Sequence, residues 1–356
     1  MSRWNHLKKF RIIRLNATLI PVYLAEAAQY RRFDLHPVPV EASTPEEILA
    51  CAADCDALVV SPASLPRQVI ESLNQCQIIS RLGAGTDKID VAAAARKGIV
   101  VSNAPAFCVE EMSDHVMALL LSLARQIPRM SRHMYAGAYL QARVEGVRLR
   151  RVSGSVLGLV GFGATGKAVA RRARAFGLRV LSTRRDMNAS RQEADALGVE
   201  MVDLETLLRQ SDFVSLHLPL TPESYHLLDD DALRKMKPGA YLINTSRGAL
   251  VDEHALVACL REGRLAGAAL DTFEGIEIFT EKEAPPSHPL AGLENVILTP
   301  HVSGLSVEAL EDVAKTAVEN LVSVLSGHYP PPENIVNRGV VSRFSLAPYD
   351  PSLFAE

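Results

Sequence analysis

The fold class follows from one stretch of sequence, Val156-Leu157-Gly158-Leu159-Val160-Gly161-Phe162-Gly163-Ala164-Thr165-Gly166. Its first five residues are an apolar run typical of a buried strand, and residues 167–176 have a helical pattern that ends at Gly177. Between them stands Gly-x-Gly-x-x-Gly. Its first glycine permits a tight turn, its second a close approach to a pyrophosphate, and its third close packing of helix on strand. We therefore predict that dinucleotide phosphates bind Gly161, Gly163, Ala164, Thr165 and Gly166.

Strand and helix patterns alternate on both sides of this motif. Apolar runs at 11–15, 57–61, 77–81 and 99–102 are separated by helical patterns, and the alternation resumes from 155 to about 300. A long helical pattern at 109–134, interrupted near Pro128, lies between the two regions, and a last helix is expected at 307–325. The order predicts an α/β protein with two doubly wound parallel-sheet domains. The residues after Asn337 lack periodicity and are expected to form a loosely held tail.

Composition excludes several classes of function. The 356 residues suggest two domains, and 38 basic against 41 acidic residues argue against nucleic acid or an anionic membrane as partner. The five cysteines are scattered without a Cys-x-x-Cys pair, so neither a metal site nor a disulfide framework is expected. The most apolar stretch, 116–124, is about half the ~20 residues that span a bilayer, and the N-terminus lacks a signal core. These features predict a cytoplasmic protein.

The strand after the glycine motif indicates which dinucleotide binds. An Asp or Glu that holds the adenosine ribose is expected about 20 residues after the loop. The sequence there is Ser182-Thr183-Arg184-Arg185, and Asp186 comes two positions late. Two guanidinium groups and two hydroxyls suit a 2′-phosphate, whereas a carboxylate would repel it. We therefore predict NADP as the preferred cofactor, with NAD possible.

Three later strands end in residues that suit hydride chemistry. Residues 242–248 end with Arg247, residues 268–274 contain Asp271, and residues 296–304 contain His301. Ligands of open α/β sheets bind at the carboxyl ends of the strands, so these side chains should converge. A His can give a proton to a forming alkoxide, an acid behind it fixes its tautomer, and an Arg grips a carboxylate.

The motifs as a set resemble the D-isomer-specific 2-hydroxyacid dehydrogenases, over about residues 77–337. They are 83–90, 161–166, 217–221, 236–239, 244–248 and 299–304. The resemblance implies that Arg247 binds the substrate's carboxylate and keto oxygen, that His301 is the acid/base, and that amides around Ala84 and Gly85 hold the carboxylate. Ser182, Arg184 and Arg185 look like those of NADP-preferring members. We also assign to the cofactor His217, Leu218, Pro219, Thr221, Thr245, Ser246, Asp271, Ser303 and Gly304.

The resemblance further implies a discontinuous arrangement of domains. A flavodoxin-like substrate domain would comprise residues 1–108 and 304–340, with a Rossmann domain, 109–303, inserted and a tail at 341–356. The active site would lie in the cleft between the domains. The helices around Val109–Met134 usually build a homodimer in this family.

One departure affects the acid. Family members usually have Asp-x-Phe-Glu-x-Glu-Pro, with the second Glu paired to the His. Here Ile276 holds the expected position, Glu277 falls one residue later, and the segment is longer than usual. We predict that Glu277 pairs with His301, with Glu274 as the second candidate.

The leading hypothesis is an NADPH-dependent reductase of small 2-keto acids, such as glyoxylate or hydroxypyruvate, that forms D-2-hydroxy acids. An NAD-dependent 3-phosphoglycerate-type dehydrogenase is an alternative. Ser61-Pro62-Ala63-Ser64 offers no Arg for its phosphate, however, and no long regulatory domain is expected after Asn337. A corepressor-like protein that senses a dinucleotide is a further alternative, since such relatives can retain the Arg, Glu and His.

Overall fold

The structure is a computed structural model that describes residues 3–18, 23–147, 149–276, 278–279 and 285–354. The chain divides into two compact units. The first runs to Phe107 and resumes at Ser306, and the second begins at Cys108 and ends at Leu305, with Phe279 grouped with the first. Each unit is an α/β sandwich around a parallel sheet, as the alternation of strands and helices predicts.

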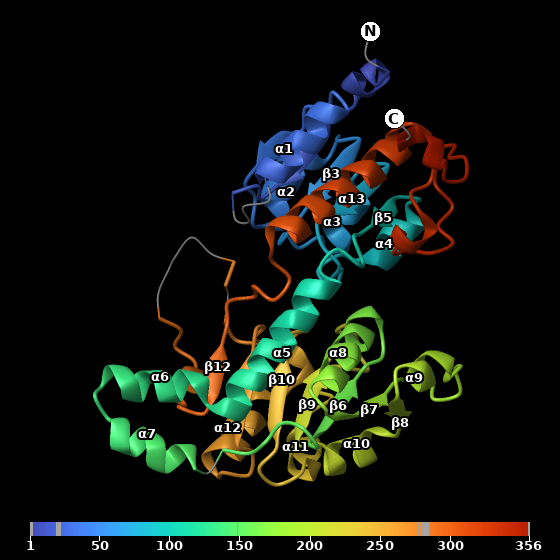
Figure 1. The fold of residues 1–356 in the computed structure, drawn as a ribbon. Coiled ribbons are helices and arrows are strands. Elements are labelled where there is room, and N and C mark those ends of the chain that lie inside the picture. Colours follow the sequence, from blue (N-terminus) through green and yellow to red (C-terminus); the bar gives the residue numbers. More distant parts are fainter. Residues whose placement is uncertain (1–2, 19–22, 148, 277, 280–284, 355–356) are drawn as a thin grey trace. The chain divides into compact units, whose positions relative to one another are not determined.

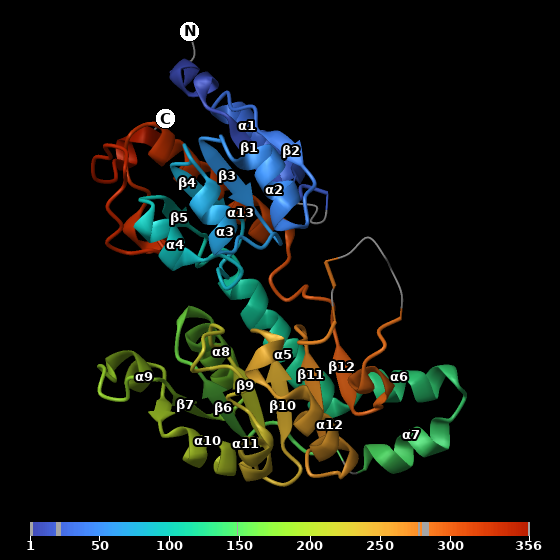
Figure 2. The same cartoon turned by 180° about the vertical axis from the view of Figure 1, so that it is seen from behind.

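The first unit contains a five-stranded sheet in the order β2-β1-β3-β4-β5, and every pair is parallel. This is the flavodoxin-like order. Its strands are β1 (Ile12–Leu15), β2 (Val38–Val40), β3 (Ala57–Val60), β4 (Ile78–Arg81) and β5 (Val100–Ser102). Helices α1 (Tyr23–Arg32) and α13 (Val307–Leu325) pack on one face, and α2 (Pro45–Ala52), α3 (Arg67–Ser72) and α4 (Val91–Arg96) on the other (Figures 1 and 2).

Local sequence explains most of these elements and one omission. Thr44 caps α2 in a capping box with Glu47, which stabilises the helix start that the Ser-Thr-Pro-Glu-Glu sequence predicts. The edge strand β2 was not predicted. It has only three residues, includes Pro39 and is largely exposed, so it lacks the apolar run that marks a buried strand.

The C-terminal segment differs from the loosely held tail that we expected. Arg343 donates from Nη2 to the carbonyl oxygen of Cys76 at 2.8 Å, and the amide of Ala347 donates to the carbonyl oxygen of Gly327. The ring of Phe354 packs edge-on against Phe33. The short helices η1 (Asn5–Lys9), η4 (Pro332–Asn334) and η5 (Pro351–Phe354) complete this unit. Isolated side-chain and backbone contacts hold the segment, and such contacts leave no periodic signal in the sequence.

The second unit contains a seven-stranded parallel sheet in the order β12-β11-β10-β9-β6-β7-β8. Its strands are β6 (Val156–Val160), β7 (Arg179–Thr183), β8 (Val199–Met201), β9 (Phe213–Leu216), β10 (Tyr241–Asn244), β11 (Gly267–Leu270) and β12 (Val296–Leu298). Counted from β6, the order is that of a Rossmann fold with one further strand, and the topological switch point lies between β6 and β9.

Helices cover both faces of this sheet. The apolar side chains of α5 (Val109–Arg125), α8 (Ala164–Ala175) and α9 (Gln192–Ala196) pack on one face, and those of α10 (Leu204–Gln210), α11 (Asp230–Lys235) and α12 (Glu253–Arg261) on the other (Figure 2). The predicted interruption near Pro128 lies at Gln126. Its φ of +52° ends α5, and α6 (Ile127–Tyr135) begins directly after it. Helix α7 (Tyr139–Gly146) and the short helices η2 (Gly248–Leu250) and η3 (Pro289–Gly292) complete the unit.

Candidate active site

The glycine loop after β6 packs closely against neighbouring backbone at Gly161 and Gly166, but not at Gly163. Gly161 has a φ of +110°, and a Cβ there would lie 2.4 Å from the carbonyl oxygen of His217. A Cβ on Gly166 would lie 2.5 Å from the carbonyl oxygen of Gly161. Gly163 forms the N-cap of α8, and a Cβ there would meet nothing within 4 Å. The loop therefore leaves open space beside the N-terminus of α8, where backbone amides favour phosphate.

Buried polar atoms without partners gather at the carboxyl edge of the same sheet. Among the described residues, four such atoms follow β7, β9, β10 and β11: Arg184 Nε, His217 Nδ1, Thr245 Oγ1 and Thr272 Oγ1. Buried polar groups rarely lack a partner, so their concentration at one edge suits a polar ligand. Together with the space at Gly163, this edge fits a dinucleotide.

The basic segment after β7 is only partly available to such a ligand. Ser182 is fully buried, and its hydroxyl donates to the carbonyl oxygen of Leu159 at 3.0 Å. Arg184 donates from Nη2 to the carbonyl oxygen of Ser190 at 2.9 Å, and also to that of Ala189. Arg185 is exposed. The Ser182 hydroxyl is therefore committed to the sheet, and Thr183 and the two arginines remain as candidates for a 2′-phosphate.

His217, at the end of β9, is a neutral imidazole. Its Nε2 lies 3.0 Å from Ser215 Oγ. Loss of solvation by burial lowers the pKa of His217 to about 4. The ring is therefore uncharged at neutral pH and presents Nδ1 as a polar but neutral group. The next residues form a turn in which Ser224 Oγ donates to the carbonyl oxygen of Pro219 and accepts from the amide of Thr221, each at 2.8 Å.

Arg247 follows β10 on a rigid backbone. Asn244 donates from Nδ2 to the carbonyl oxygen of Arg247 at 2.7 Å and accepts from the amide of Ser246 at 3.1 Å. The hydroxyl of Ser246 in turn donates to the carbonyl oxygen of Leu216 at 2.6 Å. A Cβ on Gly248 would lie 2.0 Å from the carbonyl carbon of Phe273. The Arg247 backbone is thus held from both neighbouring strand ends, while its side chain is half-buried.

Asp271, after β11, organises the loop that carries His301. Its buried carboxylate accepts from Thr299 Oγ1 at 2.6 Å, from the amide of Val302 at 3.0 Å and from the amide of Ser303 at 2.9 Å. His301 has a φ of +56°, in the left-handed region that is uncommon for residues other than glycine. Such conformations persist where surrounding contacts determine them, often at functional sites. Arg247, Asp271 and His301 thus follow three adjacent strands of one sheet, β10, β11 and β12.

The acid expected to pair with His301 has two candidates. Glu277 lies outside the described residues. The carboxylate of Glu274 accepts from Tyr225 Oη at 3.0 Å and contacts His226 Nε2 at 2.9 Å. These two partners were not predicted, because they lie 48 and 49 residues from Glu274 and no local pattern connects them.

The other predicted substrate contact belongs to the first unit. Gly83, after β4, has a φ of +134°. The carbonyl oxygen of Ala84 accepts from Asn103 Nδ2 at 2.6 Å, and that of Gly85 accepts from Arg81 Nε at 3.1 Å. Because both carbonyl groups accept hydrogen bonds from side chains of the protein, the loop has a defined shape. A role for its amides in binding carboxylate stays a prediction.

Metal-ligating clusters and membrane-spanning helices are both absent from the residues that the structure describes. Within the described ranges, no group of three or more His, Cys, Asp or Glu side chains could hold a metal ion. No helix in the described part of the chain is both long enough and apolar enough to cross a bilayer.

Comparison with known proteins identifies the family. Residues 117–303 match the model of the D-isomer specific 2-hydroxyacid dehydrogenase, NAD binding domain. The chain is 42% identical to a glyoxylate reductase of Korarchaeum cryptofilum over 299 residues, which are 83% of this chain and 86% of the relative. It is 38% identical to a D-3-phosphoglycerate dehydrogenase of Methanocaldococcus jannaschii over 311 residues, covering 86% of this chain but 56% of that relative.

Solved structures agree with this result. A crystal structure of a protein from Thermus thermophilus superposes with a TM-score of 0.78 at 34% identity, covering 91% of this chain and 99% of that one. Sequence motifs, sheet order and relatives therefore agree. The chain belongs to the D-isomer-specific 2-hydroxyacid dehydrogenase family and is an oxidoreductase that acts on a CH–OH group with a nicotinamide dinucleotide.

Proposed function

We propose that this enzyme reduces a small 2-keto acid, of the size of glyoxylate or hydroxypyruvate, to the D-2-hydroxy acid with NADPH. The observation that carries the proposal is the placement of Arg247 and His301 after β10 and β12, on either side of β11, in a chain 42% identical to a glyoxylate reductase.

Each residue has a defined task in this reaction. The guanidinium of Arg247 binds the substrate's carboxylate and its keto oxygen, so it orients the keto acid and stabilises negative charge on that oxygen. His301 donates the proton that the oxygen takes up as C2 is reduced, and accepts it in the reverse direction. Asp271 holds the His301 loop through its backbone contacts. A bound nicotinamide supplies the hydride that adds to C2.

The proposed preference for NADPH rests on charge. The segment Thr183-Arg184-Arg185 carries two cations and no carboxylate at the position where NAD enzymes place an acid. Arg185 is exposed, and Arg184 also organises the loop through Ser190. We therefore assign the phosphate contact mainly to Arg185, with Thr183 and Arg184 beside it.

A phosphoglycerate-type activity is the second candidate, because one relative carries that name at 38% identity. One observation weighs against it. The segment Ser61-Pro62-Ala63-Ser64 contains no cation that could bind the substrate's phosphate.

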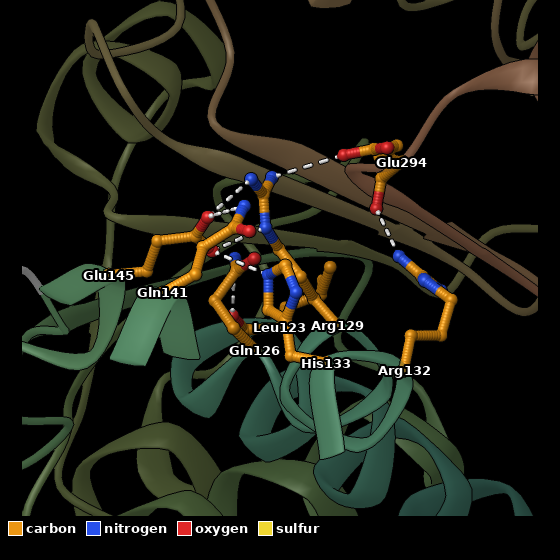
Figure 3. Close-up of polar contacts among 8 residues, drawn as sticks. All are labelled: Leu123, Gln126, Arg129, Arg132, His133, Gln141, Glu145 and Glu294. Atoms are coloured by element: carbon orange, nitrogen blue, oxygen red, sulfur yellow. Dashed lines mark hydrogen bonds and ion pairs between the residues drawn. The ribbon is translucent and has the colours of Figure 1, made fainter. Parts of the chain in front are cut away.

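We also propose that α6 and α7 form the surface of a homodimer. Charged groups tie the two helices together: Arg129 of α6 donates to Glu145 of α7 from Nε at 2.7 Å and from Nη2 at 3.0 Å, and His133 Nε2 lies 3.1 Å from the same carboxylate (Figure 3). Large apolar side chains on the pair are exposed, with Tyr135 at 91%. Exposed apolar patches of this kind mark protein interfaces. The exposed apolar residues are Ile127, Met134 and Tyr135 of α6, Tyr139, Leu140 and Val144 of α7, and Val147 directly after α7.

The deciding experiment measures NADPH and NADH oxidation separately with glyoxylate, hydroxypyruvate and 3-phosphohydroxypyruvate. A higher kcat/KM with NADPH and an unphosphorylated acid supports the proposal. Preference for the phosphorylated acid would establish the second candidate, and preference for NADH would overturn the assignment of Arg185.

Light scattering of the wild type and of Leu140→Glu tests the dimer, which the new charge should dissociate.

A further inference from the structure

We propose that Tyr225, His226 and Glu274, called here the clamp, are positioning residues that press the backbone after β11 against Gly248 and so fix Arg247. The inference rests on the proposed function, because it assigns the clamp to the residue that would bind the keto acid. Tyr225 and His226 belong to none of the predicted cofactor or substrate contacts, and Glu274 is predicted only as the second candidate for the acid that pairs with His301.

The backbone at Gly248 is in close contact with the backbone at Phe273 and Glu274. A Cβ on Gly248 would lie 2.0 Å from the carbonyl carbon and 2.5 Å from the carbonyl oxygen of Phe273, and 2.3 Å from the amide nitrogen of Glu274. The chain directly after Arg247 therefore touches the chain at Phe273 and Glu274 with no side chain between them. Any displacement of one backbone must move the other.

Three hydrogen bonds and this backbone contact together form a closed ring. The amide of His226 donates to the carbonyl oxygen of Ala249, and the amide of Leu228 donates to that of Leu250, at 2.8 and 3.0 Å. The segment from 226 to 228 is therefore tied to η2, which begins at Gly248. The side chain of His226 then reaches Glu274, whose backbone lies against Gly248, and so the ring closes.

The carboxylate of Glu274 has two partners from one segment. Tyr225 Oη lies 3.0 Å from its Oε1, and His226 Nε2 lies 2.9 Å from its Oε2. The rings of Tyr225 and His226 stack with centroids 4.0 Å apart. His226 also has a φ of +47°, a conformation that such contacts must maintain. Both rings are thus oriented toward one carboxylate.

A second contact between a carboxylate and an imidazole supports the same loop. The amide of Glu274 donates to Oε1 of Glu253 at 3.0 Å, and His288 Nε2 lies 2.9 Å from Oε2 of Glu253. Glu253 is buried at the start of α12. Backbone and side chain of Glu274 are therefore both held, which distinguishes the clamp from an ion pair between two free surface side chains.

The test compares Glu274→Ala with Glu274→Gln. The alanine variant loses both side-chain contacts, and the amide of the glutamine variant can still hydrogen-bond to Tyr225 and His226. We expect the KM for glyoxylate to rise about tenfold in the alanine variant and less than about threefold in the glutamine variant. The Kd for NADPH should stay unchanged in both. Glu262→Ala, which removes an exposed pair with Arg234 on the same unit, is the matched control.

A double-mutant cycle tests whether the clamp acts as a unit. His226→Asn keeps a residue that tolerates the left-handed backbone but removes the ring. The KM effects of His226→Asn and Glu274→Ala should be strongly non-additive, because each change breaks the same contact. Additive effects, or equal KM values in the alanine and glutamine variants, would overturn the clamp.

Hydrogen exchange of the amides of His226, Leu228 and Glu274 gives a readout that does not depend on activity. It should accelerate about tenfold in Glu274→Ala and not in the control. Unchanged exchange refutes the clamp. If the wild type reduces no 2-keto acid but exchange accelerates as expected, the proposed function fails and the clamp itself stands.

Discussion

The backbone amide of His301 donates a hydrogen bond to the carbonyl oxygen of Asp271, with 2.9 Å between nitrogen and oxygen. The carboxylate of the same aspartate accepts from the amides of Val302 and Ser303. One buried residue after β11 therefore holds three consecutive residues of the loop after β12. This explains how His301 keeps its left-handed φ of +56°.

Replacing Asp271 by Asn should therefore impair catalysis through the His301 loop. One carboxylate oxygen becomes an NH₂ group, which cannot accept from a backbone amide. We expect kcat/KM for glyoxylate to fall about 10- to 100-fold, because each lost bond is charge-assisted. Asp203→Asn is the control, since Asp203 caps α10 by accepting from the amide of Thr206. Wild-type kcat/KM in Asp271→Asn would show that the loop does not depend on this carboxylate.

Arg185→Ala should weaken NADPH binding selectively. The side chain is exposed, so its removal leaves the fold intact, while a charge-assisted contact with the 2′-phosphate is lost. We expect the Kd for NADPH to rise about tenfold and that for NADH to stay constant, as measured by cofactor fluorescence. Arg179→Ala, which removes an exposed pair with Glu200 from the start of the same strand, should change neither value. A parallel loss for both cofactors would contradict a phosphate-specific role.

The sequence predicted the sheets well because their strands are buried. Runs such as 156–160 are apolar and stand between turn and helix signals, and both predicted parallel sheets are present. Strand ends also predicted that Arg247, Asp271 and His301 follow neighbouring strands, because parallel strands end at one edge. Exposed Val38 in β2 and the contacts of Arg343 lack any such periodic signal.

The sequence could not predict contacts between distant loops, for a related reason. Nothing near Glu274 in the sequence indicates His226, and nothing near Ser182 shows that its hydroxyl would turn inward to Leu159. A hydroxyl near the end of a strand, like that of Ser182 in β7, can face the sheet or the ligand, and the register of the strand decides between them. Residue type alone therefore could not show which members of the basic segment have side chains free to bind a ligand.

Two substitutions in the glycine loop should have opposite consequences. At Gly163 a methyl group meets no protein atom within 4 Å, so Gly163→Ala should retain the wild-type Tm. That methyl group occupies the space offered to the cofactor, and we expect the Kd for NADPH to rise at least about tenfold.

At Gly166 the methyl group would lie 2.5 Å from the carbonyl oxygen of Gly161, so Gly166→Ala should destabilise the fold by about 1–3 kcal/mol. Thermal unfolding and fluorescence titration of both variants check this. A lower Tm in Gly163→Ala would mean that the loop is closed there too.

The junction between α6 and α7 should depend on pH through Glu145. Hydrogen bonds from Arg129, and next from Gln141, lower the pKa of this carboxyl to about 2 from its ordinary value of 4.5. A group with a lowered pKa in the folded state stabilises it above the unfolded value and loses that contribution as pH falls through the folded value. Glu145→Gln should therefore be less stable than the wild type at pH 7, and the difference should shrink between pH 4.5 and 2.

Urea unfolding at a fixed protein concentration measures this difference, because a dimer would make stability depend on concentration. Gln141→Ala removes one of the donors to the Glu145 carboxylate, which lie around it in Figure 3, and should give a smaller loss at pH 7. A difference between wild type and Glu145→Gln that grew toward pH 2 would contradict the sign of the pKa shift.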